Sequence, residues 1–131
     1  MNENNKKYIP LKELEVYQLA RELSKQAWQI YEKMSWQRQK IIGDQFITSI
    51  DSIGANIAEG YGRFHYLDKI KFYYNSRASM LESIIHWLEL LLEREMISSD
   101  AFDEMKKAAE KLSIKLNNFI STTYNAKRNY S

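Results

Sequence analysis

Apolar residues recur every three or four positions along four stretches of the chain, which is the spacing of an amphipathic helix. This spacing predicts a first helix over Leu11–Met34 and a second over Gln37–Glu59. The third predicted helix, Leu67–Glu95, is the longest and most apolar and contains no Gly or Pro. Before the fourth, the run Ser98-Ser99-Asp100 offers side-chain oxygens that can cap a helix N-terminus.

Within each predicted helix the apolar positions form one seam, which we expect to face a shared core. The connections between the helices are short, and short connections make consecutive helices antiparallel neighbours. The sequence therefore predicts an all-α protein, an up-down-up-down antiparallel four-helix bundle in a single domain over residues 1–131, with its polar ends, 1–10 and 125–131, frayed. The seams are Val16, Ala20, Leu23, Ala27, Ile30 and Met34; Ile42, Phe46, Ile50, Ile53 and Ile57; Ile70, Tyr74, Arg77, Leu81, Ile84, Leu88 and Leu91; and Phe102, Met105, Ala109, Leu112, Leu116, Phe119 and Thr123.

Composition supports this fold class. The 131 residues include only 4 Gly and 1 Pro, too few for the many turns of a β-sandwich, and no Cys, which excludes a disulfide framework and a thiol site. No apolar stretch approaches the ~20 residues that a membrane span needs, and the first ten residues have no apolar core of a signal peptide. We expect a cytoplasmic protein without membrane contact. The net charge, 19 − 17 = +2, is too small to indicate a polyanionic partner by itself.

The third predicted helix has more apolar surface than its seam uses. Tyr73, Met80 and Trp87 form a second line, spaced seven residues apart, and Trp28 and Tyr31 lie outside the seam of the first helix. Contiguous exposed apolar surface usually marks a partner, and the commonest partner is another copy of the chain. We expect these five residues to form an oligomer interface; the alternative is a wide stripe that fills a large core.

Candidate catalytic and metal-binding residues are sparse. Glu82, His86 and Glu89 share one face of the third helix, as metal ligands can, but a di-metal bundle needs further ligands from other helices, and this face points away from the seam. The metal signal is weak, and a solvated charged face is the interpretation that we favour for these three residues. No nucleophile, base and orienting group converge in the sequence, so we expect no enzyme activity, no metal and no cofactor.

One cation lies on a predicted seam. Arg77 would be buried there, and a buried guanidinium needs an acidic partner because its desolvation is costly. If the second and third helices fold back on each other, Asp51 lies level with Arg77. Two interpretations of Arg77 remain open: it forms a structural ion pair with Asp51, or it anchors a ligand.

The connection between the second and third helices mixes aromatic rings with cations. It reads Tyr61-Gly62-Arg63-Phe64-His65-Tyr66 and is followed by Lys69 and Lys71. Such a mixture suits single-stranded RNA or DNA, because bases stack on rings and cations meet phosphates. It equally suits a loop whose rings cap the end of the bundle. A second set of cations, Lys106, Lys107, Lys111 and Lys115, follows the fourth helix and reads as a solvated face.

The segment Ser52–Arg63, with the letters SIGANIAEGYGR, resembles the signature of the 23S rRNA intervening-sequence protein family of small bacterial four-helix bundles. The segment Arg77–Glu82 is similar to a second block of that family, and the start of the first helix is similar as well. The departures are Gly54, where a proline is usual, Ala78 for glycine, and the pair at 47–48, where many members carry two arginines.

The resemblance implies a bundle that assembles into a ring of identical subunits, for which five is the expected number, and no enzymatic activity. It also implies a relation to the accessory proteins of diversity-generating retroelements, which work beside a reverse transcriptase and bind nucleic acid. Asn56, Glu59, Gly60 and Arg77 are then residues of a structural motif. Glu59 lies at the end of a helix, where a carboxylate is unfavourable unless a donor offsets it, so we expect it to have a specific partner.

Overall fold

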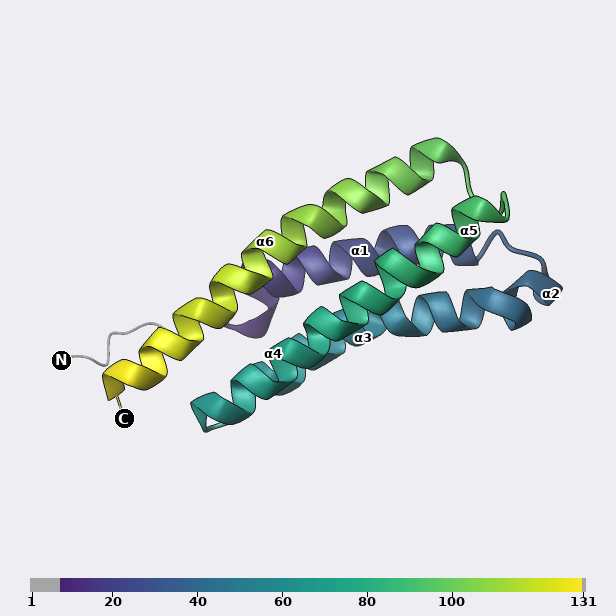
Figure 1. The fold of residues 1–131 in the computed structure, drawn as a ribbon. Coiled ribbons are helices and arrows are strands. Elements are labelled where there is room, and N and C mark those ends of the chain that lie inside the picture. The colour runs from purple at the N-terminus through teal and green to yellow at the C-terminus, as the bar shows by residue number, and fades with distance from the viewer. Residues whose placement is uncertain (1–7, 131) are drawn as a thin grey trace.

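The computed structural model describes the backbone of residues 8–130 and the side chains of residues 8–126. Over these residues the chain is an all-α four-helix bundle, as predicted (Figure 1). The elements are a short 3-10 turn η2 (Leu11–Glu13), α1 (Glu15–Tyr31), α2 (Trp36–Arg38), η3 (Gln39–Gly43), α3 (Asp44–Tyr61), α4 (Tyr66–Met80), η4 (Leu81–Leu88), α5 (Glu89–Glu93) and α6 (Ser99–Tyr130).

Several of these elements join end to end without a break. α2, η3 and α3 form one rod, as do α4, η4 and α5, so that with α1 and α6 the bundle has four members. Each member packs against two others: α1 against α3 and α6, and α4 against α3 and α6. The α1–α3 side and the α4–α6 side are therefore opposite sides of the bundle. The chain runs up and down, which places residues 8–10, the α3–α4 connection and the end of α6 together at one end, called here the loop end (Figure 1).

The core follows the predicted seams in three members. All five seam residues of the second helix are buried, as are Val16, Ala20, Leu23 and Ala27 of α1. The fourth seam is buried through Met105, Ala109, Leu112, Leu116 and Thr123, with Phe102 and Phe119 half-buried at its edges. In these members the α-helical spacing gives the buried residues correctly, although the second one contains the short π-helical segment η3.

The predicted seam of the third helix is wrong in its first half. Tyr73 and Met80 are core residues, 1% and 7% exposed, whereas Tyr74, Arg77 and Leu81 lie on the surface. The predicted oligomer interface therefore loses Tyr73 and Met80 to the core of a single subunit.

The physical reason is the helix type of η4, which is π-helical. Its hydrogen bonds span five residues instead of four, so each turn holds more residues than an α-turn. Met80, Ile84 and Leu88, spaced four apart, therefore stay on the core side. In a regular α-helix two such steps would rotate the side chains by roughly 80°. The core thus passes through Met80, and the neighbouring Leu81 is turned outward.

The ends of the helices follow ordinary capping chemistry. The Ser98 hydroxyl accepts a hydrogen bond from the Ala101 N–H at the start of α6, as the sequence indicated. Glu95, with φ 58°, occupies the left-handed position that ends α5, and the Met96 N–H bonds back to the Leu91 carbonyl. α6 remains helical to Tyr130, although residues 125–131 were expected to be frayed. Of the other expected frayed end, residues 1–7 lie outside the described part of the chain, as does residue 131.

Candidate nucleic-acid interface

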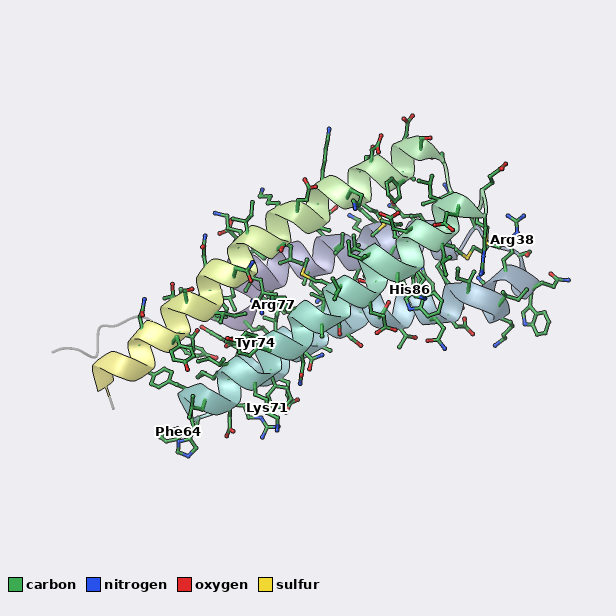
Figure 2. All side chains as sticks on the ribbon, in the orientation of Figure 1. Arg38, Phe64, Lys71, Tyr74, Arg77 and His86 are labelled. Atoms are coloured by element: carbon green, nitrogen blue, oxygen red, sulfur yellow. The ribbon has the colours of Figure 1, made fainter. Side chains whose placement is uncertain are left out.

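The α3–α4 connection is the most exposed feature of the loop end. It consists of Gly62–His65, between the end of α3 and the start of α4. Phe64 at its tip is 88% exposed and projects away from the bundle (Figure 2). The His65 ring meets it edge to face, with the ring centroids 5.0 Å apart. An exposed phenyl ring is a stacking platform that nothing in the described residues covers.

Arg63 links the end of α3 to α4. Its guanidinium donates to the Glu59 carboxylate at 2.6 Å and lies over the Phe72 ring, 4.7 Å from its centroid. The expectation that Glu59 has a specific donor is confirmed, and the donor belongs to the same subunit. Asn56 instead donates back to the Ser52 carbonyl of its own helix. Arg63 thus connects the loop to α3 and α4, and part of its side chain remains exposed to solvent.

Lys69 is also engaged inside the protein. Its ammonium donates to the Tyr61 carbonyl at 2.9 Å and lies 5.4 Å from the Tyr61 ring centroid, so it caps the end of α3. Burial lowers the pKa of this lysine. Of the four predicted binding residues, His65 and Lys71 are exposed, and neither is in an ion pair among the described residues, whereas Arg63 and Lys69 hold the loop together.

Gly60 permits the close approach of α3 and α4 at this end. A Cβ atom at this position would lie 2.7 Å from Tyr73 Cε1, 2.9 Å from Phe72 Cβ and 3.0 Å from the Lys69 carbonyl oxygen. Gly62, in contrast, has the φ of an ordinary right-handed residue. α3 ends at Tyr61 with Gly62 as its C-cap, whereas Gly60 serves the packing of α3 against α4.

The predicted pairing of Arg77 with Asp51 is wrong. Arg77 lies at the α4–α6 surface, donates to Asn117 Oδ1 at 2.9 Å and stacks over Tyr74 (Figure 2). Asp51 is exposed on the α1–α3 side, the opposite side of the bundle. The predicted register of α4 along α3 was nearly correct, because Ser76, next to Arg77, donates to the Ile53 carbonyl across the α3–α4 contact. The error in the third seam put Arg77 on the wrong face.

Exposed apolar side chains gather on two opposite sides of the bundle. Leu81 and Ile85, 64% and 53% exposed, line a groove of about 280 Å³ between η4 and α6. On the α1–α3 side, Trp28 is 51% exposed and lines the second groove, with the half-buried Tyr31 in contact with its ring. Trp87 is half-buried, and its indole N–H donates to Glu82.

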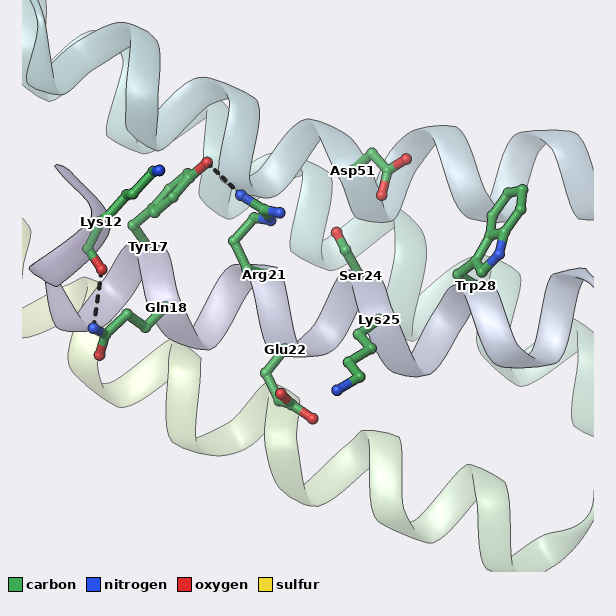
Figure 3. Close-up of a pocket in the computed structure, with 9 residues that line it drawn as sticks. All are labelled: Lys12, Tyr17, Gln18, Arg21, Glu22, Ser24, Lys25, Trp28 and Asp51. Atoms are coloured by element: carbon green, nitrogen blue, oxygen red, sulfur yellow. Dashed lines mark hydrogen bonds between the residues drawn. The ribbon is translucent and has the colours of Figure 1, made fainter.

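The α1–α3 groove has a volume of about 690 Å³ and carries charges of both signs (Figure 3). Arg21, bonded to the Tyr17 hydroxyl, and Lys25 lie close to Glu22 and to Asp51 of α3. Because these carboxylates repel phosphate, the groove fits a protein surface better than a nucleic acid. Trp28 was a predicted interface residue, but the groove could not be predicted from the sequence because it requires the α1–α3 packing.

Two of the three candidate metal ligands are engaged with other side chains. Glu82 accepts from Trp87 and Glu89 pairs with Lys106 at 3.4 Å. Among the described residues no group of His, Asp or Glu side chains is arranged to hold a metal ion. The cation set of α6 is likewise divided: Lys106 and Lys115 are in ion pairs, with Glu89 and Glu15, while Lys107 and Lys111 are exposed.

Comparison with known proteins identifies one relationship. The family model of the 23S rRNA-intervening sequence protein matches residues 12–118, most of the chain. No curated protein matches the chain. None of the helices in the described range 8–130 combines the length and apolar character that crossing a membrane requires.

Proposed function

This chain belongs to the 23S rRNA-intervening sequence protein family, and on that premise we propose that it is a non-enzymatic, homo-oligomeric bundle that binds single-stranded RNA or DNA at its loop end. The observation that carries the proposal is the exposed Phe64 ring, which contacts the His65 ring and follows Arg63 in the chain, together with the exposed Lys71 in α4. A ring gives a stacking surface to any base, and the cations meet the phosphates beside it.

In an assembly of several subunits the binding surface occurs once per subunit, and this repetition strengthens binding. The grooves on the two sides of the bundle differ, one being largely apolar and the other carrying charges of both signs beside Trp28, so in the proposed assembly one side of a subunit meets the other side of the next. Such head-to-tail contacts form closed rings when the rotation closes. A ring, with five subunits as the proposed number, repeats the loop end around one rim. Weak sites engaged together raise avidity by orders of magnitude, which compensates for the net charge of only +2.

Single-residue variants test the binding surface. Lys71→Ala and Phe64→Ala should each weaken binding of a short single-stranded RNA in a gel shift, and Lys71→Ala should also reduce the salt dependence. Lys107→Ala removes the same charge from an exposed position on α6 and serves as the control. If the parent protein binds no RNA or DNA at low salt, the proposal is wrong. If only Lys107→Ala weakens binding, the loop end is the wrong surface.

Interface variants test the head-to-tail assembly. Trp28→Glu and Leu81→Glu each place a charge in one of the two grooves, so light scattering should show 15.6 kDa monomers for either variant alone. Each variant keeps one intact side. An equimolar mixture should therefore form a heterodimer through the remaining sides but no ring. A mixture that stays monomeric, or variants that remain assembled, would contradict this arrangement.

A protein-binding scaffold is the second candidate function, and the mixed charges of the α1–α3 groove favour it. A narrower form of the first proposal makes the protein an accessory of a reverse transcriptase. Co-purification with the products of adjacent genes tests both the scaffold and the reverse-transcriptase accessory. The gel shift distinguishes the two, because only the accessory is expected to bind RNA or DNA.

A further inference from the structure

A small cavity lies at the loop end, at the corner where residues 8–9, the end of α3, the start of α4 and the last turns of α6 meet. Its volume is about 330 Å³, at the lower limit of small-molecule sites. Five of its lining residues are aromatic: Tyr8, Tyr61, Tyr66, Tyr73 and Phe119. Of the predicted binding residues only Lys69 lines it, and the predicted fold did not indicate a cavity here.

The aromatic walls are held in fixed positions. The Tyr61 hydroxyl donates to the Ile9 carbonyl, which keeps residues 8–9 against α3, and the Tyr8 ring stacks on the Tyr61 ring with centroids 5.9 Å apart. On the opposite wall Tyr73 and Phe119 are in contact, with centroids 4.9 Å apart. A flat ligand that enters this cavity meets rigid π surfaces without having to order them.

Polar groups are few and directional. Lys69 lines the cavity, and only one of its three N–H donors is known to be engaged, with the Tyr61 carbonyl. The pKa of Lys69 is lowered by burial, which is the environment in which a hydrogen bond to a neutral carbonyl gains strength. The Thr122 hydroxyl lies at the exposed mouth. A flat aromatic ligand with carbonyl or ring-nitrogen acceptors on its edge matches this arrangement.

From these features we propose that the cavity holds one unstacked base of a single-stranded nucleic acid, while the neighbouring nucleotides lie along Phe64 and Lys71. The inference rests on the proposed function and specifies how the strand is held. A base fits because it combines two π faces with an acceptor-bearing edge, and because its phosphates remain outside beside Arg63 and Lys71. Tyr66, which lines the cavity, follows Phe64 by two residues, so the exposed ring immediately precedes the segment of α4 that lines the cavity.

The test fills the cavity without changing charge. Thr122→Trp places an indole at its mouth, and Ser121→Trp places the same group at the adjacent exposed position, which does not line the cavity. With a single-stranded oligonucleotide that carries one 2-aminopurine, the parent and Ser121→Trp should quench the fluorescence of that base on binding. Thr122→Trp should lose the quenching and about tenfold in affinity, the effect of one lost stacked base. Its salt dependence should not change, because no phosphate contact is removed.

A second measurement uses Phe64→Ala, which lacks the exposed stacking ring. A strand with abasic sites keeps every phosphate but has no base to insert, so this variant should bind it about tenfold more weakly than the intact strand. If Phe64→Ala binds the intact and abasic strands equally, while the parent prefers the intact strand, the cavity proposal is wrong and the proposed function stands. If the parent binds neither strand at low salt, the proposed function fails and this inference fails with it.

Discussion

Replacing either of two glycines in α3 by alanine should change stability in opposite directions. Gly54 and Gly60 both lie inside this helix and both are buried. Alanine is favoured over glycine in a helix interior by roughly 1 kcal/mol, so helix propensity alone predicts that both substitutions stabilise the protein. The surroundings of the two positions differ.

At Gly54 the added Cβ would meet Ala20 Cβ at 3.6 Å and Tyr17 Cε1 at 3.9 Å, which are ordinary van der Waals contacts. Gly54→Ala should therefore keep most of the propensity gain. At Gly60 the Cβ would lie 2.9 Å from Phe72 Cβ and 3.0 Å from the Lys69 carbonyl oxygen, and neither atom can rotate away because each is part of, or attached to, the α4 backbone. Overpacking of this kind costs about 1–3 kcal/mol.

We place Gly60→Ala in the upper part of that range, since the close atoms are rigid. After subtracting the propensity gain, it should destabilise the protein by about 1–2 kcal/mol, while Gly54→Ala stabilises it by up to about 1 kcal/mol. The free energies of unfolding of the two variants should then differ by about 2–3 kcal/mol. In urea this corresponds to a separation of the unfolding midpoints on the order of 1 M.

The assay is urea unfolding followed by circular dichroism at a single protomer concentration, because assembly makes the midpoint depend on concentration. Gly60→Ala should lower the midpoint and Gly54→Ala should raise it relative to the parent. If both variants raise the midpoint, the α3–α4 contact can relax by several tenths of an ångström at little cost. The reasoning from the rigid approach at Gly60 would then be refuted.

Three further predictions concern stability. Glu95→Gly should raise the unfolding free energy by about 1 kcal/mol, because Glu95 has φ 58° and glycine adopts this conformation without the cost of a Cβ; an unchanged Tm would contradict this. Ser76→Ala should cost about 1 kcal/mol in urea unfolding, since the buried Ser76 hydroxyl donates to Ile53 across the α3–α4 contact at 2.6 Å, and a negligible loss would count against that bond. Burial raises the pKa of Tyr73 above its ordinary value of 10.0, so this hydroxyl ionises above pH 10 in the unfolded chain but not in the folded one. Stability should therefore decline above pH 10, and Tyr73→Phe should show a smaller decline in circular dichroism between pH 10 and 12; equal declines would exclude Tyr73 as a cause.

Much of this protein follows from its sequence alone. The four helices, their antiparallel order and the cores of α1, α3 and α6 follow from the spacing of apolar residues, because a regular helix converts sequence spacing directly into a face. The donor to Glu59 was also predictable in kind, since a carboxylate at a helix C-terminus requires one. Phe64 is exposed because it lies in a short connection between two helices, and Lys71 is exposed in the α4 helix that follows.

Other features depend on the tertiary structure. The π-helical turns of η4 shift the buried face from Leu81 to Met80, and apolar spacing cannot indicate them because it assumes 3.6 residues per turn. The same shift moves Tyr73 from a predicted interface into the core and Arg77 from the core to the surface. The aromatic cavity is lined by residues 8–9 and by side chains of α3, α4 and α6, which only the packing of these separate segments brings together. Local spacing determines which face of a regular helix is buried, whereas sites made by several helices exist only after those helices have packed.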